Sequence, residues 1–262
     1  IGGLGIMTFA ILVFLIMGKR ISFKQRLLIQ SALNQNKFGG IIRLVKHVLV
    51  FSLSLEASIA FLLAIYWGPK MGWGQGIYYS IFYSVSAFNN AGFTLWPDSL
   101  ADWVGDPVVN LLITTLIIAG GLGFTVIVNL WQAHRLQDLT LHTKFILTGT
   151  IVINIFAFVV IFLLEFRNPN TLGHLPLGMK MWGAYFQAIT TRSAGFSTVD
   201  ISNLRDVTLF LMILLMYIGA GSTSTGGGIK LSTFIVLLLS VIRVLRREEE
   251  AVAFGRTVKD SN

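Results

Sequence analysis

The chain has 262 residues, of which 54 % are hydrophobic and only 12 % are charged. Soluble domains carry about 25 % charged residues, so this composition excludes an ordinary soluble protein and indicates a multi-pass membrane protein. The absence of cysteine excludes disulfides and thiolate metal sites. The formal net charge of +8 is compatible with nucleic acid, with anionic lipid or with membrane topology signals, and the positions of the charges decide among these.

Apolar segments in chain order predict helices of two lengths. An opening segment at about 4–17 is too short to span comfortably, so we interpret it as the back half of an element that starts before Ile1. We expect membrane-crossing helices at 48–66, 107–131, 144–165 and in the interrupted segment 207–242. Shorter apolar stretches at 76–88 and 180–190 are each followed by a Gly-containing turn, AFNNAGFT and TTRSAGFS. A helix too short to cross, followed by irregular backbone, predicts a re-entrant loop.

Two motifs recur along the chain and define a repeat. Asn90-Ala91-Gly92-Phe93 matches Ser193-Ala194-Gly195-Phe196 at a shift of 103 residues. Gly2-Gly3-Leu4-Gly5 matches Gly120-Gly121-Leu122-Gly123 at a shift of 118 residues, and Gly226-Gly227-Gly228 is similar to both. The repeat is therefore a helix, a short helix, an A-G-F turn and a second helix that carries a glycine pair.

Positive charges gather on one side of the predicted helices. Fifteen of the 20 lysines and arginines lie beside or after the helices that carry the glycine pairs. Because positively charged loops stay in the cytoplasm, the A-G-F turns are expected to enter from outside. The charges then act as topology signals in a lipid bilayer, and no nucleic-acid binding is expected. Asp98, Asp102 and Asp106 on the outer side would favour cations near the entrance.

A repeated helix, short helix, loop and helix is the layout of a cation channel. A monovalent cation gives up its water only where backbone carbonyl oxygens replace that water. Glycine allows the positive φ angles that turn neighbouring carbonyls toward one axis. We therefore predict selectivity-filter loops at residues 90–93 and 193–196, with the cation at Gly92 and Gly195 and with Phe93 and Phe196 packed behind. A lone A-G-F could merely end a helix, but its recurrence at equivalent places favours a pore.

The interrupted segment contains YIGAGSTSTGGGIKLS between two apolar runs. A Walker phosphate loop requires lysine directly after its second glycine, but Gly227 stands there and Lys230 comes too late. Close helix packing suits Gly120 and Gly121 better than it suits this loop. So many Gly, Ser and Thr residues break a helix, and the freed backbone groups need partners such as the wall of a cavity below the filter.

The stretches FQAITTRSAGFSTVDIS, SAFNNAGFT and IGAGSTSTGGGIKLSTF resemble the Trk/Ktr/HKT potassium transporters, and most closely the Ktr-type bacterial pore-forming subunit. The resemblance covers essentially the whole chain. It implies an all-α membrane protein with four helix–pore loop–helix repeats around one pore. It also implies potassium (K+) uptake across the bacterial plasma membrane, no enzymatic activity, a homodimer and a cytosolic nucleotide-binding regulatory ring. It leaves open whether transport depends on sodium (Na+).

The same resemblance divides the chain and assigns a gate. Residues 1–47 would hold the end of the first repeat and a basic linker, 48–143 the second repeat and 144–247 the third. Residues 248–262 would be a cytoplasmic tail or a linker to a fourth repeat outside this sequence. The loop within 219–228 would act as an intramembrane gate, made more mobile by the absence of proline. The gate residues are Gly219, Gly221, Ser222, Thr223, Ser224, Thr225, Gly226, Gly227, Gly228 and Lys230.

Other interpretations stay open on the residues alone. A secondary transporter with broken helices, carrying a small cation-coupled substrate, also interrupts helices at mid-depth, although its repeats are often inverted and these are parallel. Glu56 lies inside an apolar segment and is either functional or directed toward Lys46 or His47. Arg192 either braces its loop by bonding carbonyl oxygens or pairs with Asp200.

Overall fold

The computed structural model describes residues 41–133, 135–192, 194–222, 224–246, 252–253 and 256–257. The predicted end of the first repeat before residue 41, Ser193, Thr223 and most of the predicted tail lie outside the described residues. The described part is helical, apart from a hairpin of two-residue strands, β1 (Val252–Ala253) and β2 (Arg256–Thr257). The prediction of an all-α membrane fold is confirmed.

The helices follow the predicted order. Their bounds are α3 Ile41–Met71, α4 Trp73–Phe88, α5 Pro107–Leu122, α6 Phe124–Gln132, α7 Leu141–Glu165, α8 Leu177–Thr190, α9 Asp206–Tyr217 and α10 Leu231–Arg246. Three short 3-10 turns lie between them, η2 Ala101–Trp103, η3 Leu136–Asp138 and η4 Ile201–Asn203. The predicted short helices are α4 and α8, and the interrupted segment forms α9 and α10.

Two described helices are long and apolar enough to cross a membrane, Leu49–Met71 within α3 and Leu141–Glu165. Helices α5 and α6 would make a third span if they are taken as one bent element. The predicted helical segment over 107–131 is present as these two helices, between which the chain bends by 95°. Gly123 at the bend has φ +87°, which a residue with a side chain rarely adopts.

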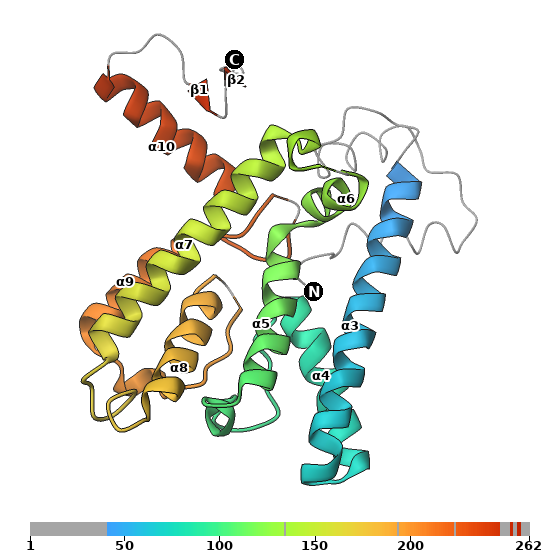
Figure 1. Cartoon of the computed structure of the whole chain (residues 1–262), viewed down its shortest axis with the longest axis vertical. Coiled ribbons are helices and arrows are strands. Elements are labelled where there is room, and N and C mark those ends of the chain that lie inside the picture. The colour runs from blue at the N-terminus through green and yellow to red at the C-terminus, as the bar shows by residue number, and fades with distance from the viewer. Residues whose placement is uncertain are drawn as a thin grey trace.

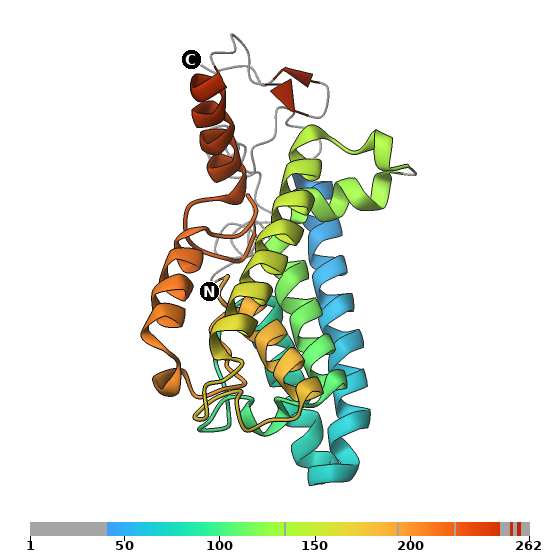
Figure 2. The ribbon, with the colours of Figure 1, turned by 60° about the vertical axis from the view of Figure 1, so that its left-hand side comes forward.

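The two short helices enter the bundle from the same end. Figure 1 shows α3 and α7 running down to the lower end of the molecule, where α4 and α8 begin and turn back inward. Helix α4 packs along α3, and α8 packs along α7, so each short helix is held by the long helix before it. In Figure 2, α9 lies below α10, and the segment that joins them turns inward at mid-height.

An aromatic cluster forms the centre of the larger core. Trp67 and Tyr83 are fully buried, with ring centroids 5.7 Å apart. Trp96 stacks on Tyr83 at 4.8 Å, and its backbone amide donates to the Tyr83 hydroxyl over 3.3 Å. The cluster joins α3 and α4 to the chain just after the first A-G-F turn, and therefore fixes where that turn lies.

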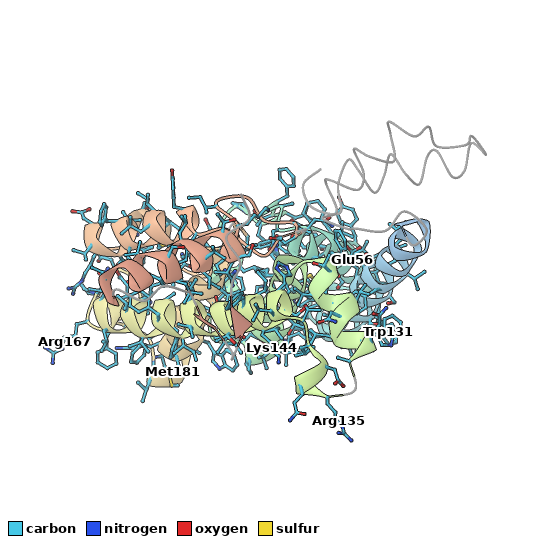
Figure 3. All side chains as sticks on the ribbon, turned by 90° about the horizontal axis from the view of Figure 1, so that it is seen from above. Glu56, Trp131, Arg135, Lys144, Arg167 and Met181 are labelled. Carbon is cyan, nitrogen blue, oxygen red and sulfur yellow. The ribbon has the colours of Figure 1, made fainter. Side chains whose placement is uncertain are left out.

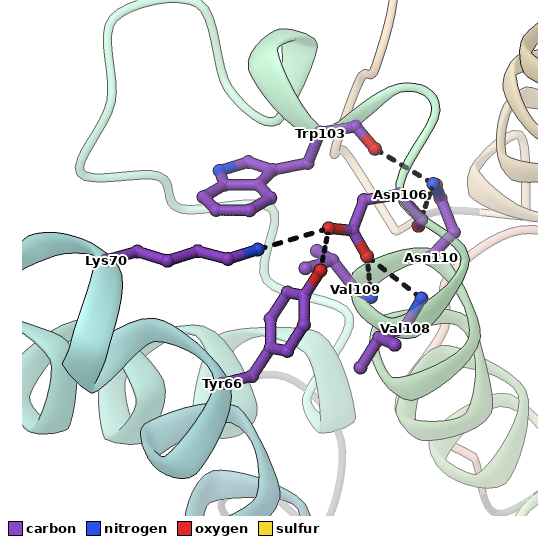
Figure 4. A network of polar contacts seen from close by, with 7 residues as sticks. All are labelled: Tyr66, Lys70, Trp103, Asp106, Val108, Val109 and Asn110. Atoms are coloured by element: carbon purple, nitrogen blue, oxygen red, sulfur yellow. Dashed lines mark hydrogen bonds and ion pairs between the residues drawn. The ribbon is translucent and has the colours of Figure 1, made fainter.

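A polar network ties the lower end of α3 to the start of α5 (Figure 4). The Asp106 carboxylate caps α5 by accepting from the Val108 and Val109 amides over 2.9 and 3.1 Å. The same carboxylate accepts from the Tyr66 hydroxyl and lies 3.7 Å from Lys70 Nζ. Asp106 therefore holds the start of α5 against the lower end of α3, and its predicted effect on cations at the outer mouth stays a prediction.

Candidate ion pathway at two re-entrant loops and a broken helix

The two A-G-F turns meet at their glycines. Gly92 and Gly195 have φ angles of +69° and +81°, the left-handed backbone that the filter prediction requires. A Cβ atom placed on Gly92 would lie 2.8 Å from Gly195 Cα and 2.9 Å from the Ala194 carbonyl oxygen. The two backbones are therefore in contact, and a side chain at either position would collide with the other loop. The structure brings together residues that are 103 positions apart in the sequence.

The two phenylalanines of the turns differ in their surroundings. Phe196 is 1 % exposed and packs on Tyr83 with ring centroids 6.1 Å apart, as expected. Phe93 is 68 % exposed in the part of the chain that the structure describes, and its packing behind the loop stays a prediction. Phe196 lies against Tyr83, an aromatic residue of α4.

The segments after the two turns are also joined. The Leu100 amide donates to the Ser197 carbonyl oxygen over 2.8 Å. The Ser197 amide donates to the Ser99 hydroxyl oxygen over 3.0 Å. Sequence reasoning missed Ser99, and its φ of +58° has no signature in a single sequence. These bonds hold the outer ends of the two loops together, beyond the glycine contact.

The break between α9 and α10 is closed by its own backbone. Ile218 and Ile229 pair in a parallel bridge, with the Gly219 amide donating to the Ile229 carbonyl oxygen over 2.9 Å. The Ile229 amide donates to the Tyr217 carbonyl oxygen over 3.1 Å, and the Leu231 amide to that of Ala220 over 3.1 Å. Backbone groups freed by the break thus find partners inside the protein, as a break at membrane depth requires.

The loop between these helices rests on the glycine pair of α5. The Gly221 amide donates to the Gly121 carbonyl oxygen over 2.8 Å, and the Thr225 amide donates to that of Gly120 over 3.1 Å. The predicted close packing is present at Gly120, where a Cβ would lie 1.9 Å from the Phe88 carbonyl oxygen, but not at Gly121, where the nearest atom would be 3.8 Å away. The glycine pair exposes two carbonyl oxygens, and the broken helix of the next repeat binds to them.

Side chains connect the same loop to the first A-G-F turn. Asn90 Nδ2 donates to Thr225 Oγ1 over 2.5 Å, and Thr225 Oγ1 donates to the Phe88 carbonyl oxygen over 3.3 Å. Phe88 and Asn90 lie four and two residues before Gly92 along the chain. The 219–228 loop therefore contacts the end of α4 and the loop that carries Gly92.

Two basic side chains bind carbonyl oxygens of the broken helix. Lys230 Nζ donates to the Gly226 carbonyl oxygen over 2.8 Å. Arg192 is 7 % exposed, and its Nη2 lies 3.5 Å from the Gly219 carbonyl oxygen. Of the two expectations for Arg192, bonding to carbonyl oxygen is observed, although the carbonyl belongs to the broken helix. Asp200 instead accepts from the Ser202 hydroxyl, which with the Ser202 amide holds the pKa of Asp200 below its ordinary value.

Glu56 lies on the side of α3 that faces the bundle (Figure 3). Asn89 Nδ2 donates to its carboxylate over 3.3 Å, and the Ser84 hydroxyl donates to its backbone carbonyl oxygen over 2.7 Å. The carboxylate therefore contacts the residue that ends the first short helix. The side chains of Lys46 and His47 lie outside the described residues. Arg135 and Arg167, by contrast, extend from the periphery of the molecule in the same view.

Glu165 is a buried acid that sequence reasoning missed. It is 0 % exposed at the end of α7. One of its carboxylate oxygens accepts from the side-chain amide of Asn168 and from the Thr171 hydroxyl, each over 2.6 Å. Its other oxygen accepts from the Arg205 amide over 3.0 Å and from the Thr208 hydroxyl over 2.5 Å. The only signal in the sequence was a single acid at the end of an otherwise apolar segment. Glu165 anchors the start of α9, and therefore the lower half of the broken helix.

The sequence matches a family model described as TrkH, cation transport protein, over residues 1–258. The chain belongs to the TrkH cation transport family. The family resemblance found in the A-G-F turns and the glycine-rich loop is thus confirmed. The prediction of a membrane protein of the cation-transport class is confirmed with it.

Within the TrkH family, the chain is 52 % identical over 259 residues to the Ktr system potassium uptake protein B of Bacillus subtilis, a match that covers 99 % of this chain and 58 % of that protein. It is 44 % identical over 260 residues to the protein of the same name from Vibrio alginolyticus, covering 98 % and 57 %. It is 38 % identical over 261 residues to the potassium/sodium uptake protein NtpJ of Enterococcus hirae, covering 100 % and 58 %. The chain thus spans less than two thirds of the length of these relatives.

A solved member of the family shares the fold. The crystal structure of the potassium transporter TrkH from Vibrio parahaemolyticus matches with a TM-score of 0.70 at 19 % identity, covering 98 % of this chain and 51 % of that one. At this identity the match establishes the arrangement of helices and not the function of individual residues.

Proposed function

We propose that this TrkH-family chain forms part of a potassium uptake protein of the bacterial plasma membrane. In this proposal residues 90–93 and 193–196 are two quarters of a carbonyl-lined selectivity filter, and the 219–228 loop with Lys230 is the gate below it. The observation that carries the proposal is the meeting of Gly92 and Gly195, both at positive φ, directly beside the docked loop of the broken helix.

The filter assignment follows from how an ion is desolvated. Potassium leaves water at little cost only where several carbonyl dipoles point at one axis, so the loops that supply them must converge. The contact between Gly92 and Gly195 brings two such loops to one place, and their φ angles turn successive carbonyls. Two further loops would come from the first and fourth repeats of the proposed ring.

The gate assignment follows from where the 219–228 loop is held. Two backbone hydrogen bonds fix it to Gly120 and Gly121, and the Asn90 and Thr225 side chains fix it to the filter loop. In this position an ion leaving the filter toward the inner side would meet the loop. The Arg192 guanidinium also donates to the Gly219 carbonyl oxygen at the start of this loop, over 3.5 Å. Displacing the loop therefore requires these few hydrogen bonds to break, and each contributes little net free energy except the one to the charged Arg192.

The remaining proposals concern the whole protein. We propose the repeat boundaries 1–47, 48–143, 144–247 and 248–262, with the A-G-F turns on the extracellular side. The charge distribution supports this orientation. A homodimer and a cytosolic nucleotide-binding regulatory ring are proposed from the family, and sodium is proposed as a coupling ion because a relative is named a potassium/sodium uptake protein.

The filter assignment is tested by Gly195→Ser in the full-length protein, expressed in bacteria that lack their own potassium uptake. Rubidium and sodium uptake are measured side by side. A side chain at Gly195 would meet Gly92 Cα, so we expect discrimination against sodium to fall. Gly178→Ser is the matched control in the same repeat. Nothing lies within 4 Å of a Cβ placed on Gly178, so this variant should keep the wild-type selectivity. Unchanged ion selectivity of Gly195→Ser at normal expression would refute the assignment.

A further inference from the structure

Each filter loop is bonded to a hydroxyl at the end of its own short helix. In the first loop, Ser86 Oγ donates to the Phe93 carbonyl oxygen over 2.9 Å. In the second, Thr190 Oγ1 donates to the Phe196 carbonyl oxygen over 2.6 Å. Both bonds join a hydroxyl near the helix end to the carbonyl that directly follows the filter glycine, although the hydroxyl lies seven residues before that carbonyl in the first loop and six residues before it in the second.

The backbones of the same two residues bind the other side of each loop. The Ala91 amide donates to the Ser86 carbonyl oxygen over 2.9 Å, and the Ala194 amide donates to the Thr190 carbonyl oxygen over 3.1 Å. One residue therefore holds the chain both before and after the glycine. The ring of contacts fixes the glycine between two bonded points, which favours its positive φ.

Neither hydroxyl makes the local bond that is usual for its type. A Ser or Thr near a helix end commonly bonds a carbonyl three or four residues back. Ser80 on α4 does so with Gly76 over 2.7 Å, and Thr191 does so with Ala188 over 2.6 Å. Ser86 and Thr190 are 6 % and 3 % exposed, so solvent does not compete for their hydroxyls, and both reach forward to the filter.

We propose that Ser86 and Thr190 are positioning residues that hold the filter carbonyls at the spacing that favours potassium over sodium. This inference rests on the proposed function and adds two residues outside the filter motif to it. Selectivity depends on the number and field strength of the carbonyl dipoles, so freedom of the loop reduces it. Losing a hydrogen bond between uncharged groups changes the equilibrium between the ordered and the freed loop about fivefold. We therefore expect each hydroxyl that is removed to lower the selectivity by about this factor.

The test compares Ser86→Ala and Thr190→Val, which remove the proposed positioning hydroxyls, with one variant that keeps such a hydroxyl and two that remove hydroxyls elsewhere. We expect each to lower the rubidium-to-sodium uptake ratio of the full-length protein about fivefold. Thr190→Ser keeps the hydroxyl and should retain the wild-type ratio. Ser80→Ala and Thr191→Val remove buried hydroxyls that bond only their own helix, and the ratio should stay unchanged.

A second measurement does not depend on transport. Hydrogen exchange of the purified protein should show faster exchange at the Ala91 amide in Ser86→Ala and at the Ala194 amide in Thr190→Val. If wild-type protein fails to select rubidium over sodium, the proposed function is wrong, while the exchange data still test the positioning role. If neither the uptake ratio nor the exchange differs between these variants and the two controls, the positioning role is overturned.

Discussion

Removing the Thr225 hydroxyl should weaken the hold of the 219–228 loop on the filter. In the substitution Thr225→Val the side chain keeps its shape but can no longer accept from Asn90 or donate to the Phe88 carbonyl oxygen. The backbone bonds of the loop to Gly120 and Gly121 do not involve this hydroxyl and remain. The loop should therefore stay folded while leaving its docked position more often.

The magnitude follows from the number of bonds lost. A neutral hydrogen bond contributes about 1 kcal/mol net, so losing two costs the docked state about 2 kcal/mol. That shifts the equilibrium between docked and undocked loop about 30-fold, because 1.4 kcal/mol corresponds to about tenfold. If undocking limits transport, the ion flux rises by up to the same factor.

Initial rubidium uptake by cells with matched amounts of full-length protein measures the effect. Thr225→Ser keeps the hydroxyl and should remain close to wild type. Thr115→Val is a second control, because the Thr115 hydroxyl bonds only the Leu111 carbonyl oxygen of its own helix, over 2.7 Å. Equal or lower uptake by Thr225→Val, with expression and the controls intact, would refute the argument that this contact restrains a gate.

Three further predictions concern residues whose roles the structure defines. Glu165→Ala should lower the free energy of unfolding by about 3 to 5 kcal/mol, because four donors lose a buried acceptor. Thermal unfolding in detergent measures this loss. Glu165→Gln is the comparison, and equal losses in the two variants would contradict the prediction. Gly120→Ala should abolish uptake or folding, since its Cβ would meet the Phe88 carbonyl oxygen, whereas Gly121→Ala, whose nearest neighbour would be 3.8 Å away, should be tolerated; equal effects would be inconsistent with this packing. Asp106→Ala should cost about 1 kcal/mol through the lost cap of α5, measured in the same unfolding assay, and an unchanged midpoint would argue against the cap.

Much of the fold follows from local patterns. The lengths of apolar runs distinguish α3 and α7, which can cross a membrane, from the short helices α4 and α8. The repeated A-G-F turn predicted two glycines at positive φ, and both have it. Each of these properties depends on residues close together in the sequence, so periodicity and glycine placement were sufficient to predict them.

Other features depended on neighbours that are distant in the sequence. Phe196 packs on Tyr83, a residue 113 positions earlier in the chain. The Asn90 and Thr225 side chains, which join the first A-G-F turn to the 219–228 loop, are 135 residues apart. No spacing rule relates such pairs, since their contact depends on how α5, α9 and α10 pack.

The sequence by itself determined that this is a helical membrane protein with repeated re-entrant turns and a helix broken by glycine and hydroxyl residues. These conclusions rest on composition and local backbone preference, which a single chain displays directly. Only the tertiary structure decided which groups meet: the carbonyl oxygens of the glycine pair of α5 accept from the broken helix, and the Ser86 and Thr190 hydroxyls donate to the carbonyl oxygens of the two A-G-F turns. The physical reason is that a buried polar group must find a partner, but its type does not say which partner the fold will bring to it.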